Sequence, residues 1–338
     1  MKLSLLDGSG RSHKGLAVAF ATVILITPLG HGVAAADNQK KCGPVNATIV
    51  GTPGDDKIKG TPGFDVIAAL GGDDVVLGGA GFDLICGDEG HDILSGSGFL
   101  VGGSGNDTLT GDTGDDFLQG DSGRDILEGG LGNDLLFGGG GSEDVASFQG
   151  ASDRVVVDLR TGQASGAGQD ALIEIEHVLG SKQDDTIFGD VHDNLLAGLG
   201  GNDLIFGSDG SDQVFGGPGT DELLGEGGGD TLAPGEGEDL VTGGNGLDWV
   251  DYSGAGGSIQ VILLIGTAMG EGADTLVGIE RVVGSEFDDV VVGDAGSNRL
   301  LGGNGNDVLD ASAGEDSIDG GGGIDICLNS ERSERCEP

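Results

Sequence analysis

The sequence is poor in aromatic and in basic residues. Only 4% of its 338 residues are aromatic, with one Trp and one Tyr, and Lys and Arg together number 15. A chain of this length would usually form one to three domains, but so few large side chains do not fill a conventional dense core. We therefore expect regular repetition of small contacts in place of a bulky interior.

Positive charge is too scarce to balance the 58 Asp and Glu residues, so the formal net charge is −43 at pH 7. A surface this negative repels nucleic acid and anionic membranes, and we expect no nucleic-acid partner. Cations are the natural counterpart. The acidic, glycine-rich composition is also typical of disordered chains, an alternative against which only strict periodicity argues.

Long apolar runs are missing except near the N-terminus. Basic residues precede the apolar segment 15–30, and the small-residue site Ala34-x-Ala36 follows it. This order is typical of a secretory signal peptide, so we expect residues 1–36 to be cleaved and the protein to be secreted. A membrane anchor is the alternative. The run is shorter than the ~20 residues that a membrane span needs.

Cysteine is rare, with four residues in the whole chain: Cys42, Cys86, Cys327 and Cys336. An even number fits an oxidising compartment and two disulfides. Their positions favour local pairs, Cys42 with Cys86 and Cys327 with Cys336. Metal ligation competes with this interpretation, but there is no CxxC and no adjacent histidine to indicate zinc.

Catalytic motifs are also missing. The sequence contains no GxSxG, HExxH, EF-hand loop or phosphate-binding GxxxxGK[ST]. Of five histidines, His13 and His31 lie in the N-terminal segment, His91 lies in a repeat, and His177 and His192 stand alone. We expect no enzyme, although a hydrolase that uses His177 remains an alternative.

Glycine, by contrast, is abundant, with 74 residues, and much of it recurs in units of nine. The segment 102–137 divides into GGSGNDTLT, GDTGDDFLQ, GDSGRDILE and GGLGNDLLF. Each unit has a glycine-rich hexapeptide, an aspartate at position six and an aliphatic residue at position eight. Glycine enters positive φ freely and turns the chain, while three residues suffice for a short strand. We expect each unit to be a turn plus a strand.

The acidic and aliphatic positions recur together in three blocks. The segment 96–101 breaks the first block, because it is three residues short and lacks the aspartate. Position six is occupied by Asp56, Asp65, Asp74, Asp83, Asp92, Asp107, Asp116, Asp125 and Asp134, then by Asp185, Asn194, Asp203, Asp212, Asp221, Asp230, Asp239 and Asp248, and then by Asp289, Asn298, Asp307, Asp316 and Asp325. Position eight is aliphatic from Ile58 to Ile318 and ends at Cys327.

A repeat this short suits a solenoid. If successive units lie on opposite sides of a flattened coil, residues eighteen apart stack, as Asp107 does over Asp125. Carboxylates stacked at the ~4.8 Å strand spacing repel each other by ~1 kcal/mol in a water-like dielectric and by ~3 to 4 kcal/mol near a dielectric of 20. We therefore expect a cation between them.

The units resemble the GGxGxDxUx nonapeptide of the RTX, or haemolysin-type, calcium-binding family, from Gly51 to about Cys327 apart from two spacers. The resemblance implies an all-β fold, a right-handed parallel β-roll or β-solenoid. It also implies multiple Ca²⁺ ions, bound by glycine-loop carbonyls and by every position-six residue named above. Oxygen ligands suit calcium. Asn194 and Asn298 each lack a charge, so we expect weaker sites there.

The two spacers resemble each other. Each has an apolar run, a glycine turn and a final Glu176-His177 or Glu280-Arg281 step. We expect bulkier β-strands that continue the solenoid, with a ligand site as the alternative. The expected organisation is a signal peptide at 1–36, a cap and first block at 37–148, a spacer at 149–180, a second block at 181–253, a spacer at 254–284, and a third block with a disulfide-closed cap at 285–338.

These features favour a secreted calcium-binding repeat protein in which Ca²⁺ drives folding, with a structural, cell-surface or matrix role. A calcium-dependent adhesion or partner-binding module, with a cell-surface or glycan partner, is the alternative. The family includes toxins, proteases and lipases with a further catalytic or pore-forming domain, and nothing in this sequence indicates such a domain.

Overall fold

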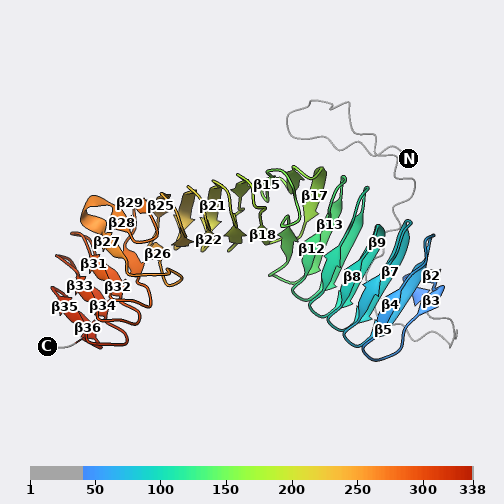
Figure 1. Ribbon diagram of the computed structural model, residues 1–338, viewed down its shortest axis with the longest axis horizontal. Coiled ribbons are helices and arrows are strands. Elements are labelled where there is room, and N and C mark those ends of the chain that lie inside the picture. Colours follow the sequence, from blue (N-terminus) through green and yellow to red (C-terminus); the bar gives the residue numbers. More distant parts are fainter. Residues whose placement is uncertain (1–40, 337–338) are drawn as a thin grey trace. The chain divides into compact units, whose positions relative to one another are not determined.

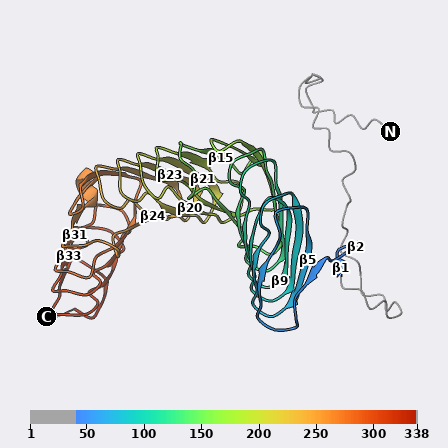
Figure 2. The same ribbon diagram turned by 45° about the vertical axis from the view of Figure 1, so that its right-hand side comes forward.

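The computed structural model describes residues 41–336, which belong to one compact unit spanning residues 39–338. Figures 1 and 2 show this unit as a coil of short strands, and Figure 2 shows the turns of the first block as nested loops. Its described part has one short helical segment, the 3-10 turn η1 (Leu263–Ile265). The expected signal peptide, residues 1–36, lies outside the described residues.

One face of the coil is a sheet of 15 parallel strands. In pairing order these are β4 (Lys57–Lys59), β6 (Val75–Leu77), β8 (Ile93–Ser95), β10 (Thr108–Thr110), β12 (Ile126–Glu128), β14 (Val145–Ser147), β18 (His177–Leu179), β20 (Leu195–Ala197), β22 (Gln213–Phe215), β24 (Thr231–Ala233), β26 (Trp249–Asp251), β30 (Arg281–Val283), β32 (Arg299–Leu301), β34 (Ser317–Asp319) and β36 (Arg332–Glu334).

The opposite face is a second sheet. In pairing order it contains β3 (Ile49–Val50), β5 (Val66–Gly71), β7 (Asp83–Glu89), β9 (Gly98–Ser104), β11 (Phe117–Ser122), β13 (Leu135–Gly140), β17 (Gln169–Ile173), β16 (Gln163–Ser165), β15 (Val156–Asp158), β19 (Thr186–Phe188), β21 (Leu204–Gly210), β23 (Glu222–Gly228), β25 (Leu240–Asn245), β29 (Ala273–Val277), β28 (Thr267–Met269), β27 (Gln260–Ile262), β31 (Val290–Val292), β33 (Val308–Asp310) and β35 (Ile326–Leu328).

The strand register confirms that one turn of the coil takes two repeats. Leu109 in β10 aligns with Leu127 in β12 on one face, and Leu118 in β11 aligns with Leu136 in β13 on the other. Both pairs are eighteen residues apart. The fold is thus the expected all-β parallel solenoid, a β-roll.

The core is a double column of position-eight side chains. From Ile67 to Ile318, each aliphatic residue at this position is 0% exposed, whereas Ile58 in the first turn is only partly buried. Leu100, in the shortened unit, is also 0% exposed and aligns with Leu118 in the next strand of the sheet. This unit therefore keeps its strand although it lacks the aspartate. One aliphatic side chain per unit is enough because the strands repeat so closely.

Removing one of these side chains should be costly. We expect Leu118→Ala to lower the free energy of unfolding by about 2 to 5 kcal/mol, because Leu118 is fully buried and its neighbours in the stack cannot collapse into the space. Chemical denaturation in saturating Ca²⁺ measures the change. Gln119→Ala, on the outward face of the same strand, is the matched control and should change stability far less. Equal losses in the two variants would contradict a core built from the position-eight side chains.

The spacers continue the solenoid, as expected, but not with parallel strands alone. In the first spacer β16 pairs antiparallel with both β15 and β17, and in the second β28 pairs antiparallel with β27 and β29. Gly162 and Gly166 turn the first of these reversed strands, at φ values of 64° and 134°. Each spacer therefore inserts three strands into one sheet and a single strand into the other.

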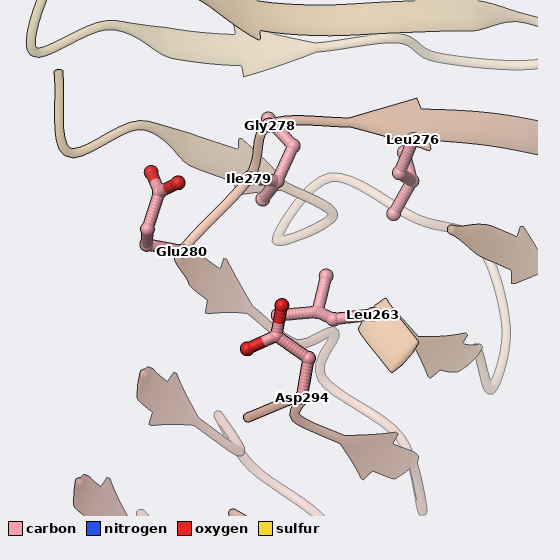
Figure 3. Close-up of a pocket in the computed structure, with 6 residues that line it drawn as sticks. All are labelled: Leu263, Leu276, Gly278, Ile279, Glu280 and Asp294. Atoms are coloured by element: carbon pink, nitrogen blue, oxygen red, sulfur yellow. The ribbon is translucent and has the colours of Figure 1, made fainter. Parts of the chain in front are cut away.

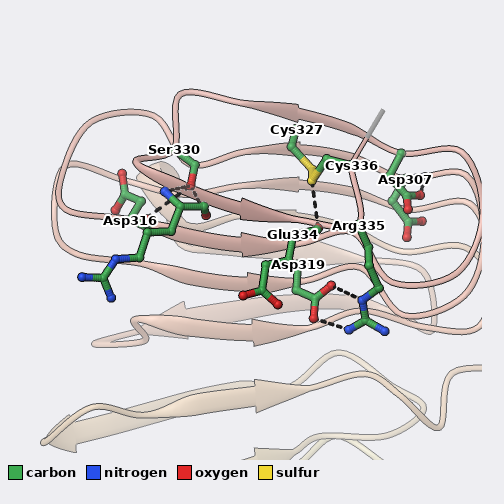
Figure 4. The surroundings of a disulfide bond; sticks show 10 residues. Asp307, Asp316, Asp319, Cys327, Ser330, Glu334, Arg335 and Cys336 are labelled. Atoms are coloured by element: carbon green, nitrogen blue, oxygen red, sulfur yellow. Dashed lines mark hydrogen bonds and ion pairs between the residues drawn. A yellow bond between two sulfur atoms is a disulfide. The ribbon is translucent and has the colours of Figure 1, made fainter. Parts of the chain in front are cut away.

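Both ends of the coil carry a disulfide in the pairing that the sequence favoured. Cys42, in the hairpin of β1 (Lys41–Cys42) and β2 (Val45–Asn46), bonds to Cys86 in β7. At the other end Cys327 bonds to Cys336 beside the last strand, β36. Figure 4 shows the C-terminal bond next to the ion pair between Arg335 and Asp319. Solenoid ends need protection because their strand edges are unpaired.

Candidate metal centres in the glycine-rich turns

The position-six residues form continuous ladders along the coil. Every one of those predicted from the sequence except Asp56 is at least nine-tenths buried. In most turns one carboxylate oxygen, Oδ1, accepts a hydrogen bond from the backbone N–H of the position-six residue on the preceding turn. Asp107 N–H donates to Asp125 Oδ1 at 2.8 Å, and Asp203 N–H donates to Asp221 Oδ1 at 2.8 Å. The structure therefore stacks the predicted residues in the predicted pairs.

The contact differs from the expected meeting of two carboxylates across an ion. In most turns Oδ1 already accepts a hydrogen bond from a backbone donor, whereas the second oxygen, Oδ2, differs from turn to turn. This second oxygen is buried and has no hydrogen-bond donor in Asp74, Asp83, Asp92, Asp107, Asp125, Asp134, Asp144, Asp203, Asp212, Asp221, Asp230, Asp239, Asp248, Asp307, Asp316 and Asp325. Leaving one such acceptor without a partner costs about 1 to 3 kcal/mol or more.

The surroundings of these oxygens fit a cation. A Cβ atom placed on Gly102 would lie 2.2 Å from Asp107 Oδ2 and 2.8 Å from the carbonyl oxygen of Gly120. The same arrangement recurs at Gly225, with Asp230 Oδ2 at 2.3 Å and the Gly243 carbonyl at 2.5 Å. Two acceptors thus converge where only glycine leaves room, and a hard cation with oxygen ligands suits such a place.

Side chains alone do not complete a ligand shell. Among residues 41–336, no group of three or more His, Cys, Asp or Glu side chains is placed to hold a metal ion. An ion in these turns would therefore rely on backbone carbonyls in addition to the aspartates. The glycine-rich sequence supplies them, because the chain backbones approach each other closely there.

Burial also changes the acidity of the aspartates. Loss of solvent raises the pKa of Asp107, Asp203 and Asp212 to about 7; the N–H bond to each opposes this rise, and acidic residues on adjacent turns add to it. Asp125 and Asp230 shift in the same direction, to about 6, for the same leading reason. The charged form is thus disfavoured in the turns without a cation.

Several members of the ladders were missed from the sequence. Asp125 N–H donates to Asp144 Oδ1, and Asp134 N–H donates to Asp170 Oδ1. In the second spacer Asp274 accepts in the same way from Asp239 N–H. A signal for them existed, since GAGQDAL (166–172) and GEGADTL (270–276) each contain a GxGxDxU half repeat. Asp144 does not fit the nine-residue pattern because its unit has ten residues.

Glutamates extend the ladders further, at the ends of the two spacers and, through Glu331, which accepts from Asp316 N–H at 2.7 Å, at the C-terminal end. Asp144 N–H donates to Glu176 Oε2, and Asp248 N–H donates to Glu280 Oε2, both at 3.0 Å. The Glu-x-aliphatic step at the end of each spacer thus takes the place of the Asp-x-aliphatic step of a repeat. The spacers keep the acidic ladder continuous while the strand pattern changes.

Position five, which varies along the sequence, forms a second ladder near the surface. His91 N–H donates to Asp73 Oδ1 at 2.9 Å, and Asn106 N–H donates to His91 Nδ1 at 2.7 Å. The ring of His91 is thus a hydrogen-bond acceptor in this ladder. His177 plays a similar part, since its Nδ1 accepts from Leu195 N–H at 3.0 Å, and burial lowers its pKa.

A small cavity of about 90 Å³ lies beside the second spacer and is lined by Leu263, Leu276, Gly278, Ile279, Glu280 and Asp294. Figure 3 shows the carboxylates of Glu280 and Asp294 at this cavity, among aliphatic side chains. Pockets that bind small organic ligands are usually about 300 to 1,000 Å³. This cavity is too small for such a ligand.

No helix in the described part of the chain is long and apolar enough to cross a membrane.

Comparison with protein families agrees with the geometry of the turns. The sequence model described as RTX calcium-binding nonapeptide repeat (4 copies) matches overlapping segments within residues 50–142, 174–232 and 274–327, which together make up more than half of the chain. No curated protein matches the chain. The matched segments contain most of the stacked aspartates and glycine-rich turns described above, and Asp144, Asp170, Asp239 and Asp248 lie outside them. The chain belongs to the family of RTX calcium-binding nonapeptide-repeat proteins.

Proposed function

We propose that this protein is a secreted calcium-binding β-roll with a structural, cell-surface or matrix role, in which Ca²⁺ bound in the turns drives folding. One observation carries the proposal: sixteen buried aspartate oxygens have no hydrogen-bond donor. Buried charges persist when they are paired or coordinate a metal. The position-six aspartates and the glycine carbonyls beside them would hold the ions, and calcium would supply the positive charge that neutralises stacked carboxylates.

Secretion is supported by two features of the chain and by the usual affinity of extracellular calcium sites. Its two disulfides suit an oxidising compartment, and residues 1–36 have the order of a signal peptide. Extracellular calcium modules also bind at ~10⁻⁴ to 10⁻³ M, so the chain would fill its sites outside the cell and not in the cytosol.

Calorimetric titration tests the proposal directly. We expect the chain, freed of metal by dialysis against chelator, to bind many Ca²⁺ ions with affinities between micromolar and millimolar. Magnesium at the same concentrations should bind far less, because it demands a tighter octahedral site and keeps its waters. The proposal would lose its basis if the titration released no heat and if the chain, dialysed against buffer that contains Ca²⁺, retained no calcium.

Adhesion or partner binding is a second candidate, favoured by aromatic side chains on the outer face of the sheet that contains β7, β9 and β11. The rings of Phe82 and Phe99 lie 5.4 Å apart, and those of Phe99 and Phe117 lie 5.5 Å apart. Phe82 and Phe99 are exposed. Exposed apolar patches often mark interaction sites. This function would show as retention on cells or glycans that disappears when calcium is removed.

A further inference from the structure

The repeats contain two kinds of turn. In a closed turn a backbone N–H of the same turn donates to the side-chain oxygen at position six, and in an open turn that oxygen has no donor. In seven turns the backbone N–H at position two donates to the side-chain oxygen at position six, over 2.5 to 3.2 Å. In the sixteen others no donor reaches that oxygen. The closed turns are those of Asp56, Asp65, Asp116, Asp185, Asn194, Asp289 and Asn298.

The backbone angle φ of the residue at position two differs between the open and the closed turns without exception. In all sixteen open turns this residue has φ between 70° and 122°. None of the seven closed turns has positive φ at this position. The residues at positive φ are Leu70, Gly79, Asp88, Gly103, Asp121, Gly130, Gly139, Leu199, Ser208, Gly217, Glu226, Gly235, Gly244, Gly303, Ser312 and Gly321.

The open conformation is costly where position two is not glycine. Leu70, Leu199 and Glu226 have φ values of 91°, 77° and 71°, a region that costs an L-residue about 1 to 2 kcal/mol. The chain therefore holds strained residues in turns where the Oδ2 atom of the aspartate also has no hydrogen-bond donor. Strain of this kind persists when something in the folded protein compensates for it, and it is typical of ligand sites.

The closed conformation has visible causes in five of the seven turns. Thr52 and Thr61 each precede a proline, which pushes the residue before it towards extended backbone. In three other closed turns, position four is Gln183, His192 or Phe287 in place of glycine. Nothing in the sequence explains the remaining two, the turns of Asp116 and Asn298.

Side chains complete the closure. The hydroxyl of Ser181 donates to Asp185 Oδ1 at 2.9 Å, and that of Ser285 donates to Asp289 Oδ1 at 2.8 Å. In its turn Asn194 replaces the carboxylate, and its Nδ2 donates to the Glu176 carbonyl at 2.8 Å. The amide group thus satisfies both of its ends without a cation.

From this division we infer that the sixteen open turns take Ca²⁺, that the seven closed turns take none, and that the conformation at position two decides between them. The inference rests on the proposed function and assigns its sites turn by turn. Six of the seven closed turns are the first two turns of the three blocks, and the seventh, that of Asp116, lies inside the first block. Each block thus begins with two turns that are complete without metal, and its calcium-binding turns follow.

A matched pair of substitutions tests the inference on neighbouring turns. Asp203→Asn removes an open carboxylate, and Asp185→Asn removes a closed one from the turn stacked beside it. We expect Asp203→Asn to lower the number of bound Ca²⁺ ions per chain by at least one and Asp185→Asn to leave it unchanged. Elemental analysis of the full chain after equilibrium dialysis gives this number, and circular dichroism in Ca²⁺ shows that both variants are folded.

The outcomes separate the inference from the proposed function. Equal losses in the two variants, or no loss in either, would overturn the division into open and closed turns while calcium binding stands. A parent chain that retains no calcium would overturn the proposed function itself. Should Asp203→Asn fail to fold, Asp230→Asn and Asp289→Asn form a second open and closed pair with the same expected difference.

Discussion

In a chelator the protein is expected to lose most of its β structure, and millimolar Ca²⁺ is expected to restore it. The sixteen open carboxylates are buried within strand-forming units that each bury a single aliphatic side chain. Burying one such side chain contributes about 1.5 to 3 kcal/mol, while one unsatisfied buried acceptor costs a comparable 1 to 3 kcal/mol or more. Without cations, the two effects oppose each other in each of the sixteen units with an open turn.

The net charge of −43 acts in the same direction, since self-repulsion destabilises a compact state. Far-UV circular dichroism at pH 7.5, first in chelator and then with Ca²⁺ added stepwise, measures the transition. Magnesium at equal concentration is the control and should restore much less structure. Identical β-rich spectra in chelator and in calcium would show that the coil is stable without the ion.

In the absence of calcium, acidification should also induce folding. The pKa of buried aspartates such as Asp107, Asp203 and Asp239 is raised to about 7, chiefly by loss of solvent, and in the unfolded chain it is about 3.9. The folded state therefore binds protons more tightly, and its stability rises as pH falls. The penalty for ionisation is complete above pH 7 and decreases as pH falls through 7 and 6 towards 5.

Circular dichroism of the metal-free chain between pH 8 and pH 5 measures this effect, and we expect β structure to increase with a midpoint between pH 5 and 7. Sodium chloride at pH 8 is the control, because it screens surface repulsion but does not protonate buried groups. If salt alone restores the same structure, or if β content decreases on acidification, the buried carboxylates are not what keeps the metal-free chain unfolded.

The sequence was sufficient to predict the architecture because position six and position eight carry independent information. Leu118 and Asp116 face different partners, yet both recur at the same spacing, so either position predicts a repeating solenoid. The turn of two units was an assumption about how the units alternate, and the parallel β-roll was what the family resemblance implied. The reversed strands β16 and β28 could not be predicted in this way. Their residues lie outside the nine-residue period, and their direction depends on which strand they pair with in the folded coil.

The division into open and closed turns could not be predicted from the sequence, for a different reason. Ser208 and Ser181 both occupy position two, but Ser208 has a φ of 84° and Ser181 does not have positive φ. The residue type alone therefore does not determine whether the carboxylate is closed. The choice depends on the neighbouring residues, such as Gln183 at position four, whose effect becomes apparent only once the path of the turn is known.

A structure built by adding identical rungs has no intrinsic stopping point, because its last strand offers the same edge as every strand before it. In this protein the final rung is a ring, closed by the bond between Cys327 and Cys336, and its outermost strand β36 carries the charged side chains Arg332 and Glu334. Both features discourage another molecule from continuing the stack. The disulfide and these charges thus make this edge of the described coil a poor template for an added strand.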